Sequence, residues 1–263
     1  MLKKLLGFLM IFSLSTYYGQ EKNISVSTEA EVVGGKEAIE QVLQTQLTLP
    51  KVLLTKNFSQ QFTVYFELDS LNHAKSLTFN VTLNNVLRKE IIRIMRFLEF
   101  KRKTAISETP YEYYLNFSIT TDKYNKYAKQ RTKAFLKPKP ADSSFVVFSK
   151  ADRSPEYYKK GEEGLAEFVV SEIQYPDVAR EKSIEGTVVL EFVVETNGYV
   201  TNIEARQGIG GGCTEEAMRV ISQTKWIPAE INNKYVRYKI TYPITFNLRN
   251  TFRDNSSSRE GGY

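Results

Sequence analysis

The chain has 263 residues, of which 41% are hydrophobic and 25% are charged, and its formal net charge is +6. This is the composition of a folded protein with one large or two small domains. A single cysteine (Cys213) and a single histidine (His73) exclude an intrachain disulfide framework and zinc sites built from several Cys or His ligands. Hydrolases with a Ser-His-Asp or Cys-His arrangement would have only His73 as their base. We therefore expect a binding protein without a cofactor rather than an enzyme.

Residues 1–19 have the pattern of a secretory signal peptide. Lys3 and Lys4 precede a short apolar segment from Leu5 to Leu14, and polar or small residues lead to Gly19. The apolar segment is too short for a membrane-spanning helix, which needs about 20 residues. We expect cleavage near Gly19. An uncleaved N-terminus that stays in the membrane is the alternative, and the N-terminal residue of the mature protein separates the two.

The hydrophobic pattern of residues 31–120 recurs later in the chain. The two copies are offset by a constant number of residues, the same number that separates Pro50 from Pro176. The stretch before each of these prolines has apolar residues at helical spacing. Residues 62–68 and 188–194 then alternate between apolar and polar side chains, which is typical of a strand with one buried face. The matching helical positions are Ile39, Val42, Leu43 and Leu47 in the first copy and Leu165, Phe168, Val169 and Ile173 in the second.

A hairpin, a second strand, a second helix and a third strand follow in each copy. Asn197-Gly198 predicts a two-residue type I′ turn, and Asn72 occupies the position of Gly198 in the first copy. We expect the third strands within residues 111–119 and 236–248. The third strand can pair antiparallel only with the first, so the predicted sheet order is second, first, third. The third strand is then an open edge, and Pro243 fits such a position.

The predicted fold is therefore α+β, with two tandem domains that each have a small three-stranded antiparallel sheet and two helices packed on it. Residues 121–160 form a basic connector, with 11 Lys or Arg against 4 Asp or Glu. A patch for an anionic partner and a solvated linker are the two interpretations of this connector. Residues 249–263 are rich in Ser, Asn and Gly and are expected to be a disordered tail. The run at residues 208–212 lacks the Gly-Lys-Ser/Thr ending of a phosphate-binding loop, so we expect no nucleotide site there.

Residues 161–248 carry a set of motifs in a fixed order. Tyr175-Pro176 comes first, Asn197-Gly198 follows the first strand, and a glycine-rich turn leads into the second helix. The segment resembles the C-terminal domain of the TonB family, and residues 31–120 look like a degenerate copy of the same domain. The residues that carry the resemblance are Tyr175, Pro176, Gly186, Gly198, Gly208, Gly210, Cys213, Glu216, Ala217, Trp226, Pro228, Pro243 and Phe246.

The resemblance implies a protein-interaction role in the Gram-negative cell envelope. The C-terminal domain of this family takes up a short peptide of an outer-membrane receptor by strand addition. The implied partner is an outer-membrane TonB-dependent receptor or another envelope protein, and neither nucleic acid nor a small-molecule substrate is implied. The residues expected to meet the partner, through backbone groups of the third strand, are Tyr238, Ile240, Tyr242 and Ile244.

Two features distinguish this chain from the members that couple transport to the proton-motive force. Those members have a transmembrane helix and a long Pro-rich spacer, whereas this chain has a short signal and eight prolines in all. We therefore expect a periplasmic binding protein that touches the membrane only if its signal is uncleaved. An energy transducer anchored in the inner membrane is the alternative.

Overall fold

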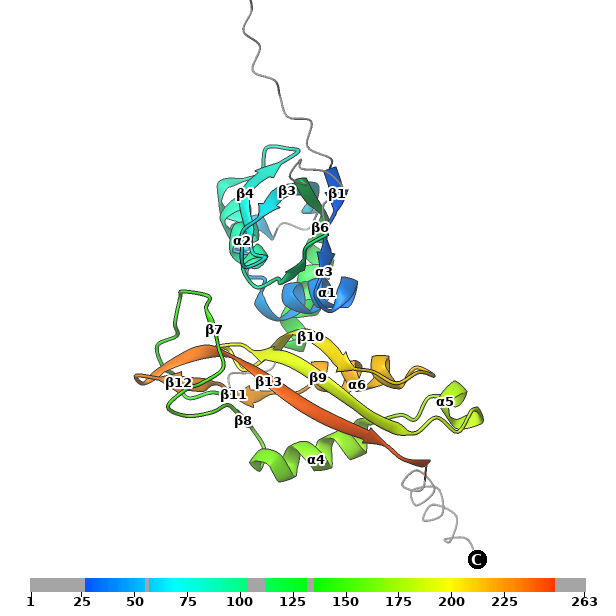
Figure 1. The fold of residues 1–263 in the computed structure, drawn as a ribbon. Helices are drawn as coiled ribbons and strands as arrows, with labels where there is room; N and C mark the ends of the chain where they lie inside the picture. The colour runs from blue at the N-terminus through cyan, green and yellow to red at the C-terminus, as the bar shows by residue number, and fades with distance from the viewer. Residues whose placement is uncertain (1–26, 55–56, 104–111, 132–134, 249–263) are drawn as a thin grey trace, which may run out of the picture.

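The computed structural model describes residues 27–54, 57–103, 112–131 and 135–248. The signal peptide predicted at residues 1–19 and the tail predicted at residues 249–263 lie outside the described residues. Within the described ranges, no helix combines the length and the apolar character needed to cross a bilayer. The chain forms two α+β units, of residues 27–131 and 135–248, which lie one above the other (Figure 1).

The first unit is a four-stranded sheet with the order β1-β6-β3-β4. Alternate side chains of β3, including Phe62, Val64 and Phe66, are at most 3% exposed because successive residues of a strand point to opposite faces. They pack against the apolar faces of α1 and α2. Its elements are β1 (Ser27–Glu29), β2 (Glu31–Val32), α1 (Gly35–Gln46), the short 3-10 helix η1 (Lys51–Leu53), β3 (Ser59–Leu68), β4 (Ala74–Phe79), α2 (Asn85–Met95), β5 (Phe100–Lys101), β6 (Glu112–Thr120) and α3 (Thr121–Gln130).

The second unit repeats this plan with the order β10-β9-β13-β12, and β7 also pairs with β13. Val188, Leu190, Phe192 and Val194 alternate along β9, and all four are 0% exposed. Its elements are β7 (Val147–Phe148), β8 (Glu156–Tyr157), α4 (Gly161–Glu172), α5 (Asp177–Glu181), β9 (Gly186–Val194), β10 (Val200–Gln207), α6 (Cys213–Ser222), β11 (Trp226–Ile227), β12 (Ala229–Ile231) and β13 (Lys234–Phe246).

The predicted strand order is confirmed in both units, as β4-β3-β6 and β10-β9-β13, with antiparallel pairing throughout. Each third strand also has a neighbour that was not predicted. β1 lies parallel to the first residues of β6, and β7 lies parallel to residues near the start of β13. These pairings span only two or three residues, which is too short to produce a recognisable alternation in the sequence.

The hairpin between β9 and β10 differs from the predicted type I′ turn. The Gly198 N–H donates to the Glu195 carbonyl at 2.8 Å, so the turn is centred on Thr196 and Asn197. Gly198 has a φ of 78°, whereas Asn197 is not among the residues with positive φ. The loop therefore has three residues and is closed by a residue in the left-handed region. The first unit has the same loop, and Asn72 takes the left-handed position with a φ of 62°.

Much of the basic connector is folded, because several of its charged and aromatic side chains have partners in the two units. Residues 121–130 form α3, where Tyr127 is 3% exposed against the first unit. Arg131 donates to the carbonyls of Gln44 and Leu43 at the end of α1. Lys139 forms an ion pair with Glu230 of β12 at 2.6 Å. These residues of the connector therefore pack on the two units.

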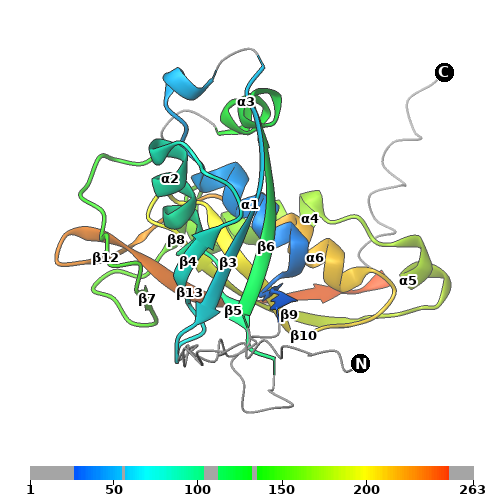
Figure 2. The same cartoon turned by 90° about the horizontal axis from the view of Figure 1, so that it is seen from above.

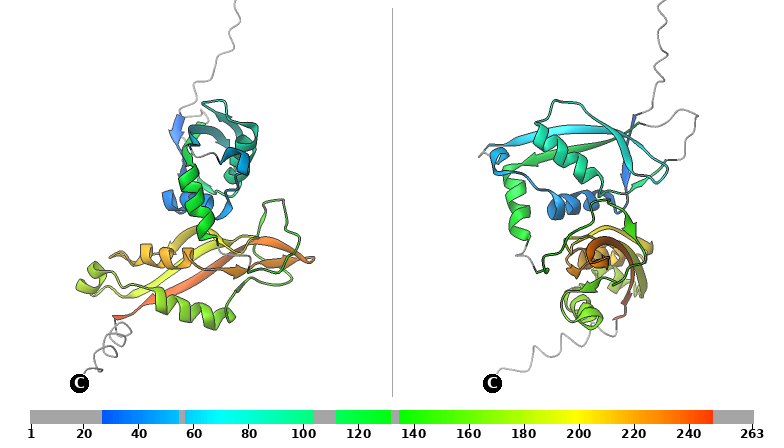
Figure 3. Two further views of the ribbon diagram at one scale, coloured as in Figure 1. Left: turned by 180° about the vertical axis from the view of Figure 1, so that it is seen from behind. Right: turned by 90° about the vertical axis from the view of Figure 1, so that its left-hand side faces the viewer.

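The first unit packs on the second through α1, which lies between the sheet of the first unit and the second unit (Figures 2 and 3). A Cβ added to Gly34 would lie 2.5 Å from the Ile203 carbonyl of β10, so only glycine allows this approach. The side-chain amides of Gln46 and Asn197 donate to each other at 3.2 and 3.0 Å across the interface. The first unit therefore lies against the start of β10, the edge strand of the second sheet.

Candidate partner-binding site

The two sides of β13 have different neighbours along its length. β9 pairs with one side from Tyr238 to Phe246. On the other side, the Tyr235 N–H donates to the Pro140 carbonyl at 2.9 Å. β7 then pairs at Arg237 and Tyr238. Beyond Tyr238, no strand in the described part of the chain pairs with this second side. The open segment of β13, residues 239–246, is therefore the exposed sheet edge of the second unit.

The hydrogen-bonding phase of β13 determines which of its backbone groups are available on the open segment. The Glu195 N–H donates to the Tyr199 carbonyl at 2.8 Å, so Glu195 faces β10 and Val194 faces β13. Val194 lies opposite Tyr238 in the register. In steps of two along the strand, the even-numbered residues of β13 therefore direct their N–H and C=O groups toward β9.

The pairing of the even-numbered residues with β9 differs from the sequence prediction of which backbone groups meet a partner. Tyr238, Ile240, Tyr242 and Ile244 have even numbers, and their backbone groups pair within the sheet. Their side chains do not line an outer surface as a set either, because Ile244 is 3% exposed and Ile240 and Tyr242 pack against the core. The backbone groups that face outward on the open segment belong to Lys239, Thr241, Pro243 and Thr245.

Pro243 fits this phase, because a proline has no N–H to donate. It lies opposite Val189 within an unbroken ladder from Tyr238 to Phe246. A proline at a position whose backbone faces β9 would remove a hydrogen bond to β9. At a position whose backbone faces outward, it removes only one donor of the open edge. The open segment therefore offers the N–H groups of Thr241 and Thr245 with a gap between them.

The start of β13 is fixed by a buried ion pair. Arg237 and Glu195 have side chains that are 5% and 0% exposed, and the Arg237 Nε lies 2.8 Å from a Glu195 carboxylate oxygen. The guanidinium also donates to the Phe145 carbonyl at 2.9 Å and to the Phe97 carbonyl at 3.5 Å. Asn202 donates to the same Phe97 carbonyl at 2.9 Å. These contacts connect β13 and β10 to the first unit.

Several residues that carry the family resemblance stabilise the second unit from within. The Tyr175 hydroxyl donates to the Ile184 carbonyl at 2.6 Å, and its ring meets the Phe246 ring at 5.7 Å. Trp226 packs on Phe192 with ring centroids 5.7 Å apart. Gly186 begins β9, Gly208 and Gly210 lie in the turn before α6, Ala217 is buried in α6, and Pro228 separates β11 from β12.

Cys213 begins α6 and is 0% exposed. Burial raises the pKa of its thiol, and the nearby carboxylates of Glu215 and Glu216 act in the same direction. A thiol that is buried and protonated at neutral pH is a poor nucleophile. Its position therefore corresponds to a packed core residue.

In each unit, an equivalent Glu–Arg ion pair of the second helix binds backbone groups at the end of the first helix. Glu216 and Arg219 form an ion pair at 2.7 Å, and the equivalent residues Glu90 and Arg93 do so at 2.7 Å. In both units the arginine donates to a carbonyl at the end of the first helix, and the glutamate accepts an N–H two residues later. These backbone partners are Gln46 and Thr48 in the first unit and Glu172 and Gln174 in the second.

The Glu216–Arg219 pair predicts part of the acid sensitivity of the fold. Burial acts to raise the pKa of Glu216, but hydrogen bonds from Arg219 and the Gln174 N–H outweigh it and hold the pKa below the usual 4.5. A carboxyl with a lower pKa in the folded state stabilises the fold above its unfolded pKa, and this contribution is lost as the pH falls through the folded value. In urea unfolding below about pH 4.5, we expect Arg219→Gln to lose less stability with falling pH than the wild type.

The difference should stay within about 1 kcal/mol, because the Arg219 side chain is 40% exposed and solvent screens the pair. Arg180→Gln is the control, since its partner Asp177 is 86% exposed. Equal acid dependence of the wild type and Arg219→Gln would contradict the assignment.

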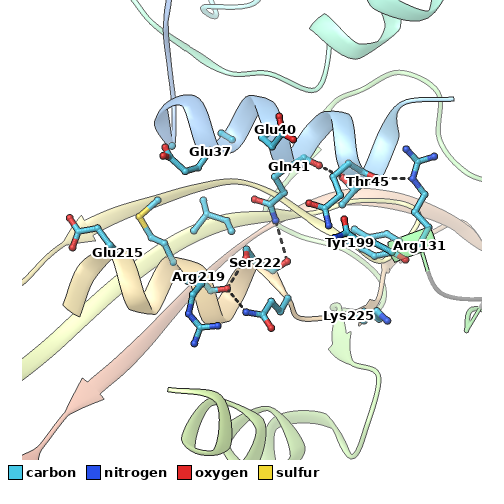
Figure 4. Close-up of a pocket in the computed structure, with 17 residues that line it drawn as sticks. Glu37, Glu40, Gln41, Thr45, Arg131, Tyr199, Glu215, Arg219, Ser222 and Lys225 are labelled. Carbon is cyan, nitrogen blue, oxygen red and sulfur yellow. Dashed lines mark hydrogen bonds between the residues drawn. The ribbon is translucent and has the colours of Figure 1, made fainter. Parts of the chain in front are cut away.

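A cavity of about 740 Å³ lies between the two units, where α1 and α6 face each other over β10 (Figure 4). Glu37 and Glu215 lie at one end, and Tyr199 and Arg131 at the other. Gln41 crosses it and donates to the Ser222 carbonyl at 3.3 Å. This cavity could not be predicted from the sequence, because it depends on how the units pack. Among the described residues, no three His, Cys, Asp or Glu side chains are grouped as metal ligands would be.

In the comparisons with known proteins, the family match falls within the second unit. The family model described as the Gram-negative bacterial TonB protein C-terminal matches residues 171–248. A solution structure of the C-terminal domain of Helicobacter pylori TonB is 20% identical, covers 35% of this chain and 88% of that chain, and has a TM-score of 0.27. A shorter segment of that domain is 21% identical, covers 33% and 92%, and has a TM-score of 0.26. No curated protein matches the chain.

Proposed function

We propose that the chain is a periplasmic binding protein of the TonB type, because residues 171–248 match the family model of the Gram-negative bacterial TonB protein C-terminal. Its partner is an outer-membrane TonB-dependent receptor or another envelope protein. The second unit binds an extended segment of that partner as an added strand along residues 239–246 of β13.

The open segment of β13 is the observation that supports this proposal. An unpaired edge offers backbone donors and acceptors to a second chain, and those bonds depend little on the partner's side chains. At the opposite edge of this sheet, the first unit lies against β10 at Ile203, and β7 covers the start of β13. Residues 239–246 form the longest stretch of sheet edge in the second unit without a paired strand among the described residues.

The signal-like pattern of residues 1–19 supports the periplasmic location. Anchoring in the inner membrane, with coupling of the proton-motive force to transport, is the alternative. A mature protein that begins near Gln20 would support the periplasmic form, whereas a chain that retains residues 1–19 would support the anchored one.

We also propose that the first unit is a degenerate copy of the same domain. Four observations support it: the shared strand order, the shared three-residue hairpin loop, the parallel strand beside the third strand, and the two equivalent ion pairs. Each residue of the ion pair in the first unit is separated from its equivalent in the second unit by the offset of the sequence repeat.

The outward phase of the open segment makes strand addition testable by amide exchange. When the full chain binds a purified outer-membrane receptor, we expect the N–H groups of Thr241 and Thr245 to become protected, since they face outward and gain acceptors. Thr245→Pro should weaken receptor binding about fivefold, because one backbone hydrogen bond is lost. Hydrogen exchange followed by NMR and a binding titration measure the two effects.

Thr245→Val is the matched control. It keeps the N–H and the β-branched shape but removes the side-chain hydrogen bond between Thr245 and Thr187, which measures 3.0 Å. We expect binding close to wild type for this variant. Receptor binding without protection of Thr241 and Thr245 would show that the partner occupies another surface.

A further inference from the structure

We propose that β7 is a fixed stop for the added strand. The partner then pairs through a segment of at most seven residues, opposite Ile240 to Phe246, and carries apolar side chains beside Ile240 and Tyr242. This inference rests on the proposed function of the open segment, and it defines the length and the side-chain pattern of the segment that binds there.

β7 is itself a short strand added to the edge of β13. It runs parallel to β13, with Phe148 opposite Tyr238 (Figure 1). In a parallel pair, a residue bonds to the two residues that flank the one opposite it. Because the backbone of odd-numbered residues of β13 faces outward, Phe148 bonds to Arg237 and Lys239. The first outward N–H that remains for a partner therefore belongs to Thr241.

Contacts on both sides of β7 hold it in this place. The buried Arg237 guanidinium donates to the Phe145 carbonyl, just before β7, at 2.9 Å. The Tyr238 hydroxyl donates to the Ser149 carbonyl, just after β7, at 2.8 Å. A partner strand would have to break these contacts before it could pair with residues 237–238. The added strand therefore ends where β7 ends.

The side chains on the core side of the open segment are covered unevenly. Ile244 and Phe246 are 3% and 2% exposed. Ile240 and Tyr242 are only half-buried, although the β9 residues opposite them are 0% exposed. The exposed parts of these two side chains therefore lie away from β9, on the side of the open edge.

The geometry of strand addition places partner side chains next to this exposed surface. An added strand lies roughly 4.8 Å from β13, and residues opposite each other have their side chains on the same face. Partner residues opposite Ile240 and Tyr242 would cover these half-buried side chains, which favours apolar residues there. Phe148 of β7 occupies the preceding position in the same row, beside Tyr238. The other face of the open segment carries exposed Thr and Pro side chains and makes no such demand.

Peptides of five, seven and nine residues with blocked ends test the proposal with the full chain. They alternate valine with threonine or lysine and begin and end with valine. NMR titration would report their affinities, and hydrogen exchange would report protection of the Thr241, Thr245 and Phe148 N–H groups. We expect the seven-residue peptide to bind about fivefold more tightly than the five-residue one, because it gains a backbone hydrogen bond. The nine-residue peptide should gain less than about twofold over the seven-residue one, because its additional residues have no edge to pair with.

Two variants of the seven-residue peptide test the side-chain pattern. Serine replaces the first two valines in one variant and the last two in the other. The variant whose serines lie beside Ile240 and Tyr242 should bind about fivefold more weakly than the other, since these two positions cover exposed apolar surface. Equal affinities of the two variants would contradict the apolar pattern.

Phe148→Pro tests the stop, because it removes the N–H of Phe148 from β7. The outward groups of Arg237 and Lys239 then become available, and the nine-residue peptide should bind about fivefold more tightly than the seven-residue one. Ala151→Pro is the matched control, since Ala151 follows β7 and lies outside the strands, and it should behave like the wild type.

The outcomes separate this inference from the proposed function. A nine-residue peptide that gains about fivefold in the wild type, with loss of Phe148 protection, would overturn the stop. Protection of Thr241 and Thr245 in that same complex would leave the proposed function intact. Failure of every peptide to protect Thr241 and Thr245 would overturn both.

Discussion

Replacement of Arg237 by methionine is expected to lower the free energy of unfolding by about 3–5 kcal/mol. The reason is the environment of Glu195, whose side chain is 0% exposed and whose carboxylate is bound by Arg237 at 2.8 Å. Without the guanidinium, the hydroxyl of Thr201 is the side-chain donor that the carboxylate keeps among the described residues. A buried charge without a counter-ion costs far more than the pair contributes.

Equilibrium urea unfolding of the full chain measures this effect, and two further variants show its origin. Lys239→Met removes a cation from the same strand, but its pair with Glu191 is 35% and 19% exposed, so we expect a loss within about 1 kcal/mol. The double variant Glu195→Leu with Arg237→Met leaves no unpaired charge and should be more stable than Arg237→Met alone. Equal losses for Arg237→Met and Lys239→Met would contradict the buried-pair argument.

Gly198→Ala is expected to cost more than about 2 kcal/mol. Part of this is the left-handed backbone of Gly198, with a φ of 78°, which costs other residues about 1–2 kcal/mol. The rest is steric, because an added Cβ would lie 2.3 Å from the Trp226 carbonyl. That segment cannot easily move, since the Trp226 N–H donates to the Gly198 carbonyl at 2.8 Å.

Thermal unfolding would compare Gly198→Ala with two controls. Gly210→Ala is a matched change in the same unit: its Cβ would have no neighbour closer than 4.0 Å and its φ is not positive, so we expect little loss. Asn72→Gly replaces the equivalent left-handed residue of the first unit and should raise stability slightly. Similar melting temperatures for Gly198→Ala and Gly210→Ala would contradict this account.

The sequence predicted the two main helices and three main strands of each unit and the order of those strands, because they depend on local periodicity. The alternation of Val188, Leu190, Phe192 and Val194 marks a strand with one buried face, and all four are buried. Element order then restricts the third strand to one side of the first. These inferences need only the spacing of apolar residues along the chain.

The backbone phase of β13 could not be predicted in this way. Side-chain alternation shows which residues face the core, but it does not show on which side of β13 the strand β9 lies. For a given apolar face, that side decides which set of backbone groups pairs inward. Pro243 was the one local sign of the true phase, since it cannot donate to β9.

The contacts between the units could not be predicted either. Glu195 follows the end of β9 and Arg237 lies near the start of β13, and charged residues are ordinarily exposed. In the structure, the Phe97 carbonyl of the first unit and the Phe145 carbonyl both accept from the buried guanidinium. The three-residue hairpin loop also escaped prediction, because Asn-Gly occurs in both loop types and the register of the flanking strands decides between them.

The covering of β10 by α1 also limits self-association of the second sheet. A sheet with two long open edges can add copies on both sides and grow into a fibre, whereas the exposed part of β10 is confined to its last residues, Arg206 and Gln207. If two copies met through their β13 strands, each would occupy the other's open segment, and only the short end of β10 would remain for a third copy. Association through this sheet is therefore expected to favour a pair, and a bound partner segment would compete with that pair.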